Sequence, residues 1–134
     1  MLGGPDDTMG SNELIRCRVA ACREGRGKWE FFLINDSAAP LDWAVLKRVG
    51  YEWGDWSNHE EGDVRVVGLA PGAHALIWRD DGDGAELRME LTLQVCMGQR
   101  EGRLVFEFPM LYKQRELPQV EGLGRAGWQT AAVF

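Results

Sequence analysis

The chain has 134 residues, of which 45% are hydrophobic and 27% are charged, and its formal net charge is −6. This length and composition are typical of one folded globular domain and argue against disorder except at the chain ends. The acidic balance argues against a nucleic-acid partner, because phosphate binding needs clustered Lys and Arg.

The first part of the chain predicts a leader and two strands. Residues 1–11 are rich in Gly and Asp and show no periodicity, so we expect a flexible leader. Residues 12–23 alternate apolar and polar side chains, which predicts a strand with one face in the core. In residues 28–35 both faces are apolar, with Phe31 on one and Phe32 on the other. We expect this second strand to be covered on both sides.

Residues 41–53 carry two competing patterns. Apolar side chains recur at every second position along much of the segment, with Lys47 as an exception. The spacing of its first apolar residues also fits a short helix, but the β-branched and aromatic content favours a strand. Residues 54–62 are expected to form a solvated loop, because five carboxylates and no Lys or Arg lie between positions 52 and 63.

The second half of the chain predicts four more strands. Residues 64–69 and 73–79 are short strands separated by a Pro-Gly turn. In residues 87–95 apolar side chains occupy all five odd positions and polar ones the four even positions. This pattern indicates the central antiparallel strand, with one face in the core. Residues 103–112 are the last expected strand, at an edge or bent at Pro109, which cannot donate to a ladder.

Seven short strands separated by turn signals predict an all-β fold, an antiparallel β-sandwich of about seven strands over residues 12–112. Two turn motifs in this predicted sandwich are similar to those of a known family. Asn35-Asp36-Ser37 follows an aromatic strand, and Gly68-Leu69-Ala70-Pro71-Gly72 precedes another. Both resemble turns of bacterial immunoglobulin-like domains.

The similarity covers about residues 28–95 and implies an immunoglobulin-like sandwich, but it implies no activity. The segment 31–37 is also similar, more faintly, to sandwich domains that precede Smr-type nuclease modules. No such module follows here, so no nuclease activity is implied.

Residues 113–134 form a segment of a different kind. They are too rich in Gly for a helix and too apolar for an idle linker. An exposed apolar tail beside open sheet edges would promote aggregation. We therefore expect an ordered C-terminal arm, containing Trp128, that packs on its own sandwich or crosses to a partner chain in a symmetric dimer.

Cysteine usage and the lack of targeting signals bear on location. The three cysteines leave at least one thiol unpaired and match no zinc spacing, so we expect buried free thiols. No apolar run is long enough to cross a bilayer, and residues 1–7 lack the features of a signal peptide. For a complete chain we therefore expect a cytoplasmic protein with no membrane contact.

No catalytic, cofactor or metal site is expected. Ser57 and His59 lie near carboxylates, but nearness in sequence provides neither an oriented base nor an oxyanion site. The acidic loop at 80–83 lacks the spacing of a calcium-binding loop. Adjacent Glu60 and Glu61 are typical of solvated side chains rather than of a metal site. The chain is therefore expected to be non-enzymatic and to need no cofactor.

Three aromatic residues, Tyr51, Trp53 and Trp56, lie close together at the mouth of the acidic loop. The parity of Tyr51 and Trp53 with Val49 favours the core, whereas Trp56 lies beyond a Gly and is harder to bury. Aromatic residues beside carboxylates are also typical of sugar-binding modules and of protein interfaces. Together with Trp128, these three are the candidate ligand or interface residues.

These observations predict a module that acts through contact with a protein partner, most simply another copy of itself in a homo-oligomer. The alternative is a carbohydrate- or small-ligand-binding module that uses the aromatic and acidic surface near residues 51–63.

Overall fold

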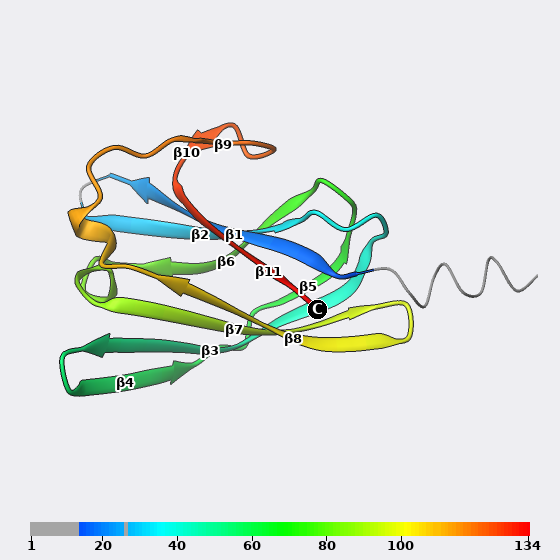
Figure 1. Cartoon of the computed structure of the whole chain (residues 1–134), viewed down its shortest axis with the longest axis horizontal. Coiled ribbons are helices and arrows are strands. Elements are labelled where there is room, and N and C mark those ends of the chain that lie inside the picture. Colours follow the sequence, from blue (N-terminus) through cyan, green and yellow to red (C-terminus); the bar gives the residue numbers. More distant parts are fainter. Residues whose placement is uncertain (1–13, 26) are drawn as a thin grey trace, which may run out of the picture.

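The computed structural model describes residues 14–25 and 27–134 and is an all-β, antiparallel sandwich (Figure 1). The predicted leader, residues 1–11, lies outside the described residues. The described part contains eleven strands, two short 3-10 helices and no α-helix. The elements are β1 (Arg16–Glu24), β2 (Lys28–Asn35), β3 (Leu41–Trp53), β4 (Trp56–Glu61), β5 (Arg65–Leu69), β6 (His74–Asp80), η1 (Gly84–Glu86), β7 (Arg88–Met97), β8 (Arg100–Phe108), η2 (Leu111–Lys113), β9 (Gln119–Val120), β10 (Arg125–Ala126) and β11 (Trp128–Val133).

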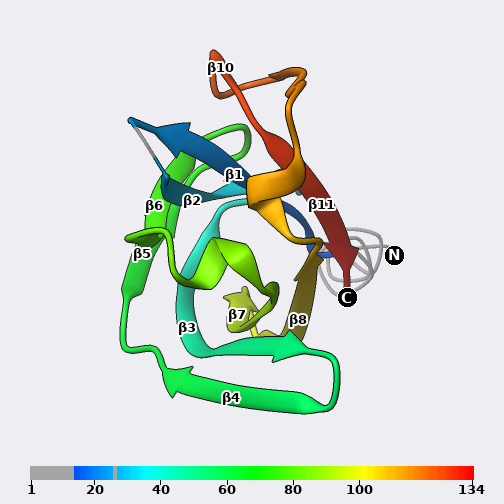
Figure 2. The same cartoon turned by 90° about the vertical axis from the view of Figure 1, so that its left-hand side faces the viewer.

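Two sheets form the sandwich. One has the strand order β11-β1-β2-β6, and the other has the order β4-β3-β7-β8, with β5 paired to β3 beyond the end of β4. All seven segments expected from the sequence are strands, and all the pairings are antiparallel. A separate pair, β9 and β10, lies at the opposite end of the molecule from the β3–β4 hairpin (Figure 2).

The core follows from the alternation in β7, which lies between β3 and β8. Its exposed Arg88 and Glu90 face away from the core. Across the sandwich, the ring of Phe31 in β2 meets the ring of Phe108 edge to face, with 5.2 Å between centroids. The predicted face of the central strand is therefore confirmed. On this face Met89, Leu91, Leu93, Val95 and Met97 are buried, whereas Leu87 lies before the start of β7 and is half-buried.

A β-bulge in β3 explains the exception at Lys47. Before it, Ala44 and Leu46 are buried, and after it the buried position is Val49. The pairing with β7 shifts by one residue between Leu46 and Arg48. Such an extra residue restarts the alternation on the opposite parity. The strand prediction for residues 41–53 is confirmed, and the helical alternative is wrong.

The expected loop at residues 54–62 is wrong, because most of it forms β4. Gly54 and Asp55 make a two-residue turn, and Gly54 has a φ of 57° at its first position. Gly tolerates this conformation, which suits a tight hairpin. All six residues of β4 are exposed. No burial alternation was therefore present in the sequence to reveal the strand.

The strand expected at residues 103–112 ends earlier than predicted. β8 runs from Arg100 to Phe108, and η2 follows Pro109. Pro109 therefore ends the ladder rather than bending it. Tyr112, at the end of the expected strand, is 53% exposed.

The two turn motifs meet at Asn35, whose side chain is fully buried. Its Nδ2 donates to the carbonyl oxygens of Leu69 (2.9 Å) and Ala39 (3.0 Å), and its Oδ1 accepts from the backbone of Ser37 (2.8 Å). The backbone N–H of Gly72 donates to the carbonyl of Asn35 (2.7 Å). The amide side chain has a partner for each donor and for its oxygen, so the motifs have a structural role in joining two turns. Membership of the immunoglobulin-like family stays a prediction.

The C-terminal segment packs on its own sandwich. β11 pairs with β1, and the backbones of Ile15 and Phe134 exchange hydrogen bonds of 2.9 and 3.0 Å. The segment that includes β9 covers the outer face of β1 and β2, so β2 is covered on both sides as predicted. This second, smaller core consists of Ala20, Cys22, Ile34 and Val120, with Phe32 and Leu123 at its margin.

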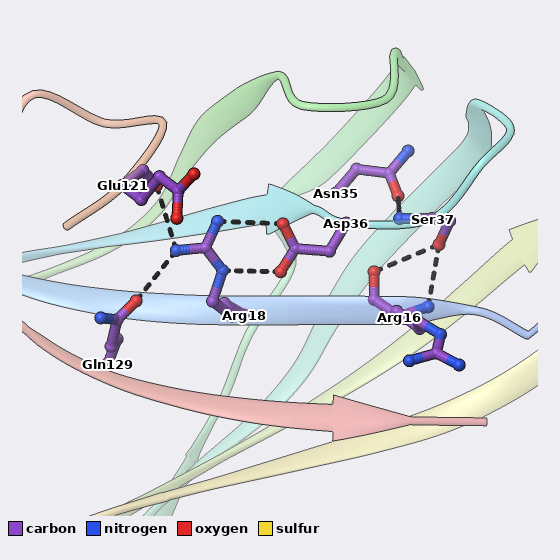
Figure 3. A network of polar contacts seen from close by, with 7 residues as sticks. All are labelled: Arg16, Arg18, Asn35, Asp36, Ser37, Glu121 and Gln129. Atoms are coloured by element: carbon purple, nitrogen blue, oxygen red, sulfur yellow. Dashed lines mark hydrogen bonds and ion pairs between the residues drawn. The ribbon is translucent and has the colours of Figure 1, made fainter.

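Arg18 ties this segment to the sandwich (Figure 3). Its guanidinium donates two hydrogen bonds to Asp36, of 2.6 and 2.9 Å, and further bonds to the carbonyl of Glu121 (3.0 Å) and to Oε1 of Gln129 (2.9 Å). The bond with Asp36 is the main cause that raises the pKa of Arg18. One side chain thus joins β1, the turn after β2 and two parts of the C-terminal segment.

The three cysteines are free and buried, as expected. Cys17 faces the main core and Cys22 faces the second core, in agreement with their opposite parity. Burial, with a smaller contribution from Asp36, raises the pKa of Cys17 to about 12. This thiol is therefore protonated and unreactive at neutral pH.

Glu30 provides a test of how the C-terminal segment is held on the outer face of β1 and β2. It is 8% exposed, and Nη1 of Arg125 donates to it at 2.9 Å, while Nε of Arg79 lies 3.4 Å from its other oxygen. Hydrogen bonding by Arg125 is the largest cause that lowers the pKa of Glu30 below its ordinary 4.5. A lowered pKa gives stability that is present above pH 4.5 and lost as the pH falls through the folded-state value.

We expect Glu30→Gln to reduce the free energy of unfolding at pH 7 by about 1–2 kcal/mol, between the values for exposed and buried ion pairs. The variant should also lose part of the acid dependence of stability. Urea unfolding at pH 7 and at pH 4 measures both effects. Glu107→Gln, on the exposed face of β8, is the control and should change neither. Equal pH dependence in wild type and Glu30→Gln would contradict the assignment.

Candidate functional site

The hairpin of β3 and β4 brings two exposed tryptophans together. Trp53 and Trp56 are cross-strand partners on either side of the Gly54–Asp55 turn. Paired residues project from the same face of a sheet, so the two indoles share one face. Trp53 is 60% and Trp56 50% exposed. The core interpretation therefore does not hold for Trp53, although its parity continues that of the buried Val49.

Tyr51 lies one step closer to the core and is half-buried against it. Its hydroxyl donates to Oε2 of Glu60 at 2.6 Å. Burial is the largest cause that raises the pKa of Tyr51, followed by this hydrogen bond to a carboxylate. The buried indole N–H of Trp78 lowers the pKa of the same hydroxyl, although it makes no hydrogen bond of good geometry. Tyr51 is therefore a neutral donor that holds Glu60 in place.

A cavity of about 400 Å³ lies between the hairpin and the turn that follows β6. Trp56, Asn58 and Glu60 line it from the hairpin, and Trp78 and Asp81 line it from the opposite side. The cavity thus combines indole faces, an amide and carboxylates. Such a set can hold a sugar ring or a cationic side chain.

Asp80 shapes this cavity without being free to bind. Its carboxylate accepts the backbone N–H groups of Gly82 (3.0 Å), Gly84 (3.1 Å) and Ala85 (3.0 Å). A side chain at Gly84 would collide with Asp80 and with the ring of Tyr51. The acidic loop at 80–83 is therefore an ordered turn organised around Asp80.

The sheet also has a hollow on the opposite face of the hairpin, over Gly50. It has a volume of about 400 Å³ and is bordered by charged side chains of both signs, among them Arg48, Glu52, Arg88 and Glu90. Gly50 leaves this space open in mid-strand. Two arginines and three glutamates line it, so the charges largely offset one another and no ligand is specified.

β4 itself is an edge strand that carries two of the five carboxylates between positions 52 and 63. No described strand lies on its outer side, and both figures place it at the rim of the molecule (Figures 1 and 2). Glu60 and Glu61 are in the strand, and no Lys or Arg occurs between Arg48 and Arg65. The backbone N–H of His59 donates to Oδ1 of Asn58 at 2.9 Å instead of to a neighbouring strand.

The structure thus brings Tyr51, Trp53 and Trp56 into one hairpin, but not Trp128. Trp128 begins β11, pairs with Ala21 of β1 and packs half-buried against the main core. Asn58 and Trp78 join the site and were not singled out from the sequence. The Gly-Asp pair between two tryptophans was the local signal for the hairpin. The approach of Trp78 depends on the packing of two sheets and left no local signal.

Comparison with protein families, with curated proteins and with solved structures finds no match for this chain. Among residues 14–25 and 27–134, no group of three or more His, Cys, Asp or Glu is placed to hold a metal ion. The same residues form no helix that is long and apolar enough to span a membrane.

Proposed function

We propose that this chain is a non-enzymatic interaction module that binds a protein partner through its β3–β4 hairpin. The docking surface, called here the hairpin surface, consists of Trp53, Trp56 and strand β4. The observation that carries the proposal is the exposure of two paired tryptophans, 60% and 50%, at the tip of the β3–β4 hairpin. Tryptophans that become buried on binding are the commonest energetic anchors of protein interfaces.

The charge of the hairpin surface indicates the kind of partner. Five carboxylates and no basic residue lie between positions 52 and 63. Self-association through this surface would bring two like-charged hairpins together, which disfavours the pairing. The hairpin surface therefore suits a different, basic partner, and self-association is proposed only through another face.

The test compares three forms of the full chain as bait. We expect Trp53→Ser combined with Trp56→Ser to lose a partner that the wild type retains from extracts of the native host. Val67→Ser, at an apolar residue that is 71% exposed on β5, is the matched control and should retain it. A partner retained equally by all three forms would contradict the proposal.

Sedimentation velocity over a range of concentrations tests self-association separately. A dimer that the double tryptophan variant abolishes would contradict the charge argument, because it would place self-association on the hairpin surface. A dimer that persists in this variant would support self-association through another face.

The second candidate function is carbohydrate binding in the cavity beside Trp56. The observation that favours it is the placement of Asn58 and Glu60, with Trp78 opposite, around a space of about 400 Å³. A sugar needs such an aromatic surface with polar groups at its margin. Tryptophan fluorescence during titration with a panel of oligosaccharides tests it. Saturable quenching that Trp56→Ala abolishes would favour this function over protein binding.

A further inference from the structure

The proposed function does not say how a partner is held, and the backbone of β4 suggests a mode. In a hairpin closed by two residues, the residues flanking the turn exchange hydrogen bonds, and bonded and non-bonded pairs then alternate along the strands. Trp53 and Trp56 flank the turn, so Trp56, Asn58 and Glu60 direct their backbone groups toward β3. Ser57, His59 and Glu61 direct theirs outward.

The hydrogen bond of His59 agrees with this alternation of inward and outward backbone groups. Its backbone N–H donates to the side chain of Asn58, at 2.9 Å, and not to β3. At the far end of the strand, the N–H of Gly62 donates to the carbonyl of Lys47 at 3.1 Å. The bond of Gly62 thus points inward, as the alternation requires of the residue after Glu61. The outer row of β4 therefore presents the backbone groups of Ser57, His59 and Glu61 to an added strand, which would displace the Asn58 side chain from the N–H of His59.

β4 lacks several of the usual protections of an edge strand. Edges are commonly blocked by Lys, by Pro or by a bulge within the strand. β4 contains neither Lys nor Pro, and its register with β3 is continuous from Trp53↔Trp56 to Arg48↔Glu61. The bulge lies at Lys47, beyond its end. Its charges are Glu60 and Glu61, which discourage pairing with a second copy but attract a basic strand.

Side chains on both faces complete the match. Glu60 and Trp56 lie on the face of the hairpin that carries Tyr51, and Glu61 lies on the opposite face. A basic side chain on the Tyr51 face of an added strand would meet the carboxylate of Glu60 beside the indole of Trp56. Arg suits this position best, because its planar cation binds carboxylate and stacks on an aromatic ring.

We propose that β4 accepts an extended, Arg-containing segment of the partner as an additional strand, hydrogen-bonded to the outward backbone groups of Ser57, His59 and Glu61. Strand addition of this kind takes affinity from the backbone and specificity from alternate side chains. The inference rests on the proposed function and specifies its binding mode and partner chemistry.

The probe is an acetylated and amidated eight-residue peptide in which Arg alternates with Thr. Two matched peptides carry N-methyl groups, one on the Arg nitrogens and the other on the Thr nitrogens, so that charge is kept and one row of backbone donors is removed in each. We expect the full chain to bind the unmodified peptide and to bind at least one N-methylated peptide about tenfold or more weakly. Amide hydrogen exchange should slow at Ser57, His59 and Glu61, while Asn58 and Glu60 change little.

Two protein variants give an independent readout. His59→Pro removes an outward N–H at an edge position that tolerates proline, and it should weaken binding of the unmodified peptide about tenfold or more. His59→Ala retains the N–H and should bind as the wild type does. Unchanged melting temperatures, measured for both variants, show that the hairpin is intact, and the N-methyl comparison needs no variant.

The outcomes separate this inference from the proposed function. Equal binding of all three peptides would show a purely electrostatic contact and overturn strand addition, while leaving the hairpin surface as a docking site. Binding of none would overturn the partner chemistry as well. The proposed function itself fails only if the double tryptophan variant retains the captured partner.

Discussion

We expect Leu91→Asp to abolish the folded state and Thr92→Asp to leave it in place, with a melting temperature only slightly lowered. Leu91 is fully buried in β7, between Val49 of β3 and Phe106 of β8. An aspartate there would be an unpaired carboxylate among apolar groups, at a cost of roughly 4 kcal/mol or more. Such a cost is comparable with the roughly 5–15 kcal/mol by which a domain of this kind is stable.

Thr92 is the matched control because it is adjacent in sequence but half-exposed on the other face, paired with Arg48. An aspartate at that position reaches water and an opposite charge. Circular dichroism during heating measures the difference between the two variants. Equal melting temperatures would contradict the assigned face of the central strand.

Truncation after Tyr112 has the second large effect. It removes β9, β10 and β11, and with them the cover over Ile34 and the apolar contacts of Val120 and Trp128. Each fully buried side chain of this kind contributes roughly 1.5–3 kcal/mol. We expect the truncated chain to melt far below the full chain, or not to fold, and its sedimentation to give no evidence of a lost dimer.

Val120→Ser refines the comparison, because it weakens the second core while β11 stays paired with β1. It should lower the melting temperature less than truncation does. Loss of a dimer with the fold retained would instead indicate an arm exchanged between two chains. If truncation changes neither mass nor melting temperature, the packing of the C-terminal segment on the sandwich contributes nothing to stability.

The periodic strands could be predicted from sequence because burial on one face leaves a period-two pattern. The segments that became β2 and β3 have the observed bounds, and β7 has the expected face. β4 could not be recognised by burial, because all of its residues are exposed and its pairing depends on a turn of Gly54 and Asp55. The strands β9 and β10 have two residues each, which is too short for any periodicity.

The candidate site was predictable to the extent that it is local. Tyr51, Trp53 and Trp56 are neighbours along one hairpin, so the sequence already placed them together. Trp78 and Asp81 reach the same cavity from the other sheet and the turn that follows it, which requires the packing of the whole sandwich. The bulge at Lys47 was only partly predictable. Its signature was visible as an exception in the alternation, but the change of parity that it causes appears only when the strands are paired.

The hydrogen bonds between Ile15 and Phe134 have a mechanical consequence. These residues end the antiparallel pair of β1 and β11 on the same side, so the two attachment points of the described domain are adjacent. A pulling force applied through them would open the pair from that end, one hydrogen bond at a time, instead of shearing all of them together. The domain would therefore yield at low force. Adjacent ends also allow it to be inserted into a surface loop of a host protein without stretching either chain.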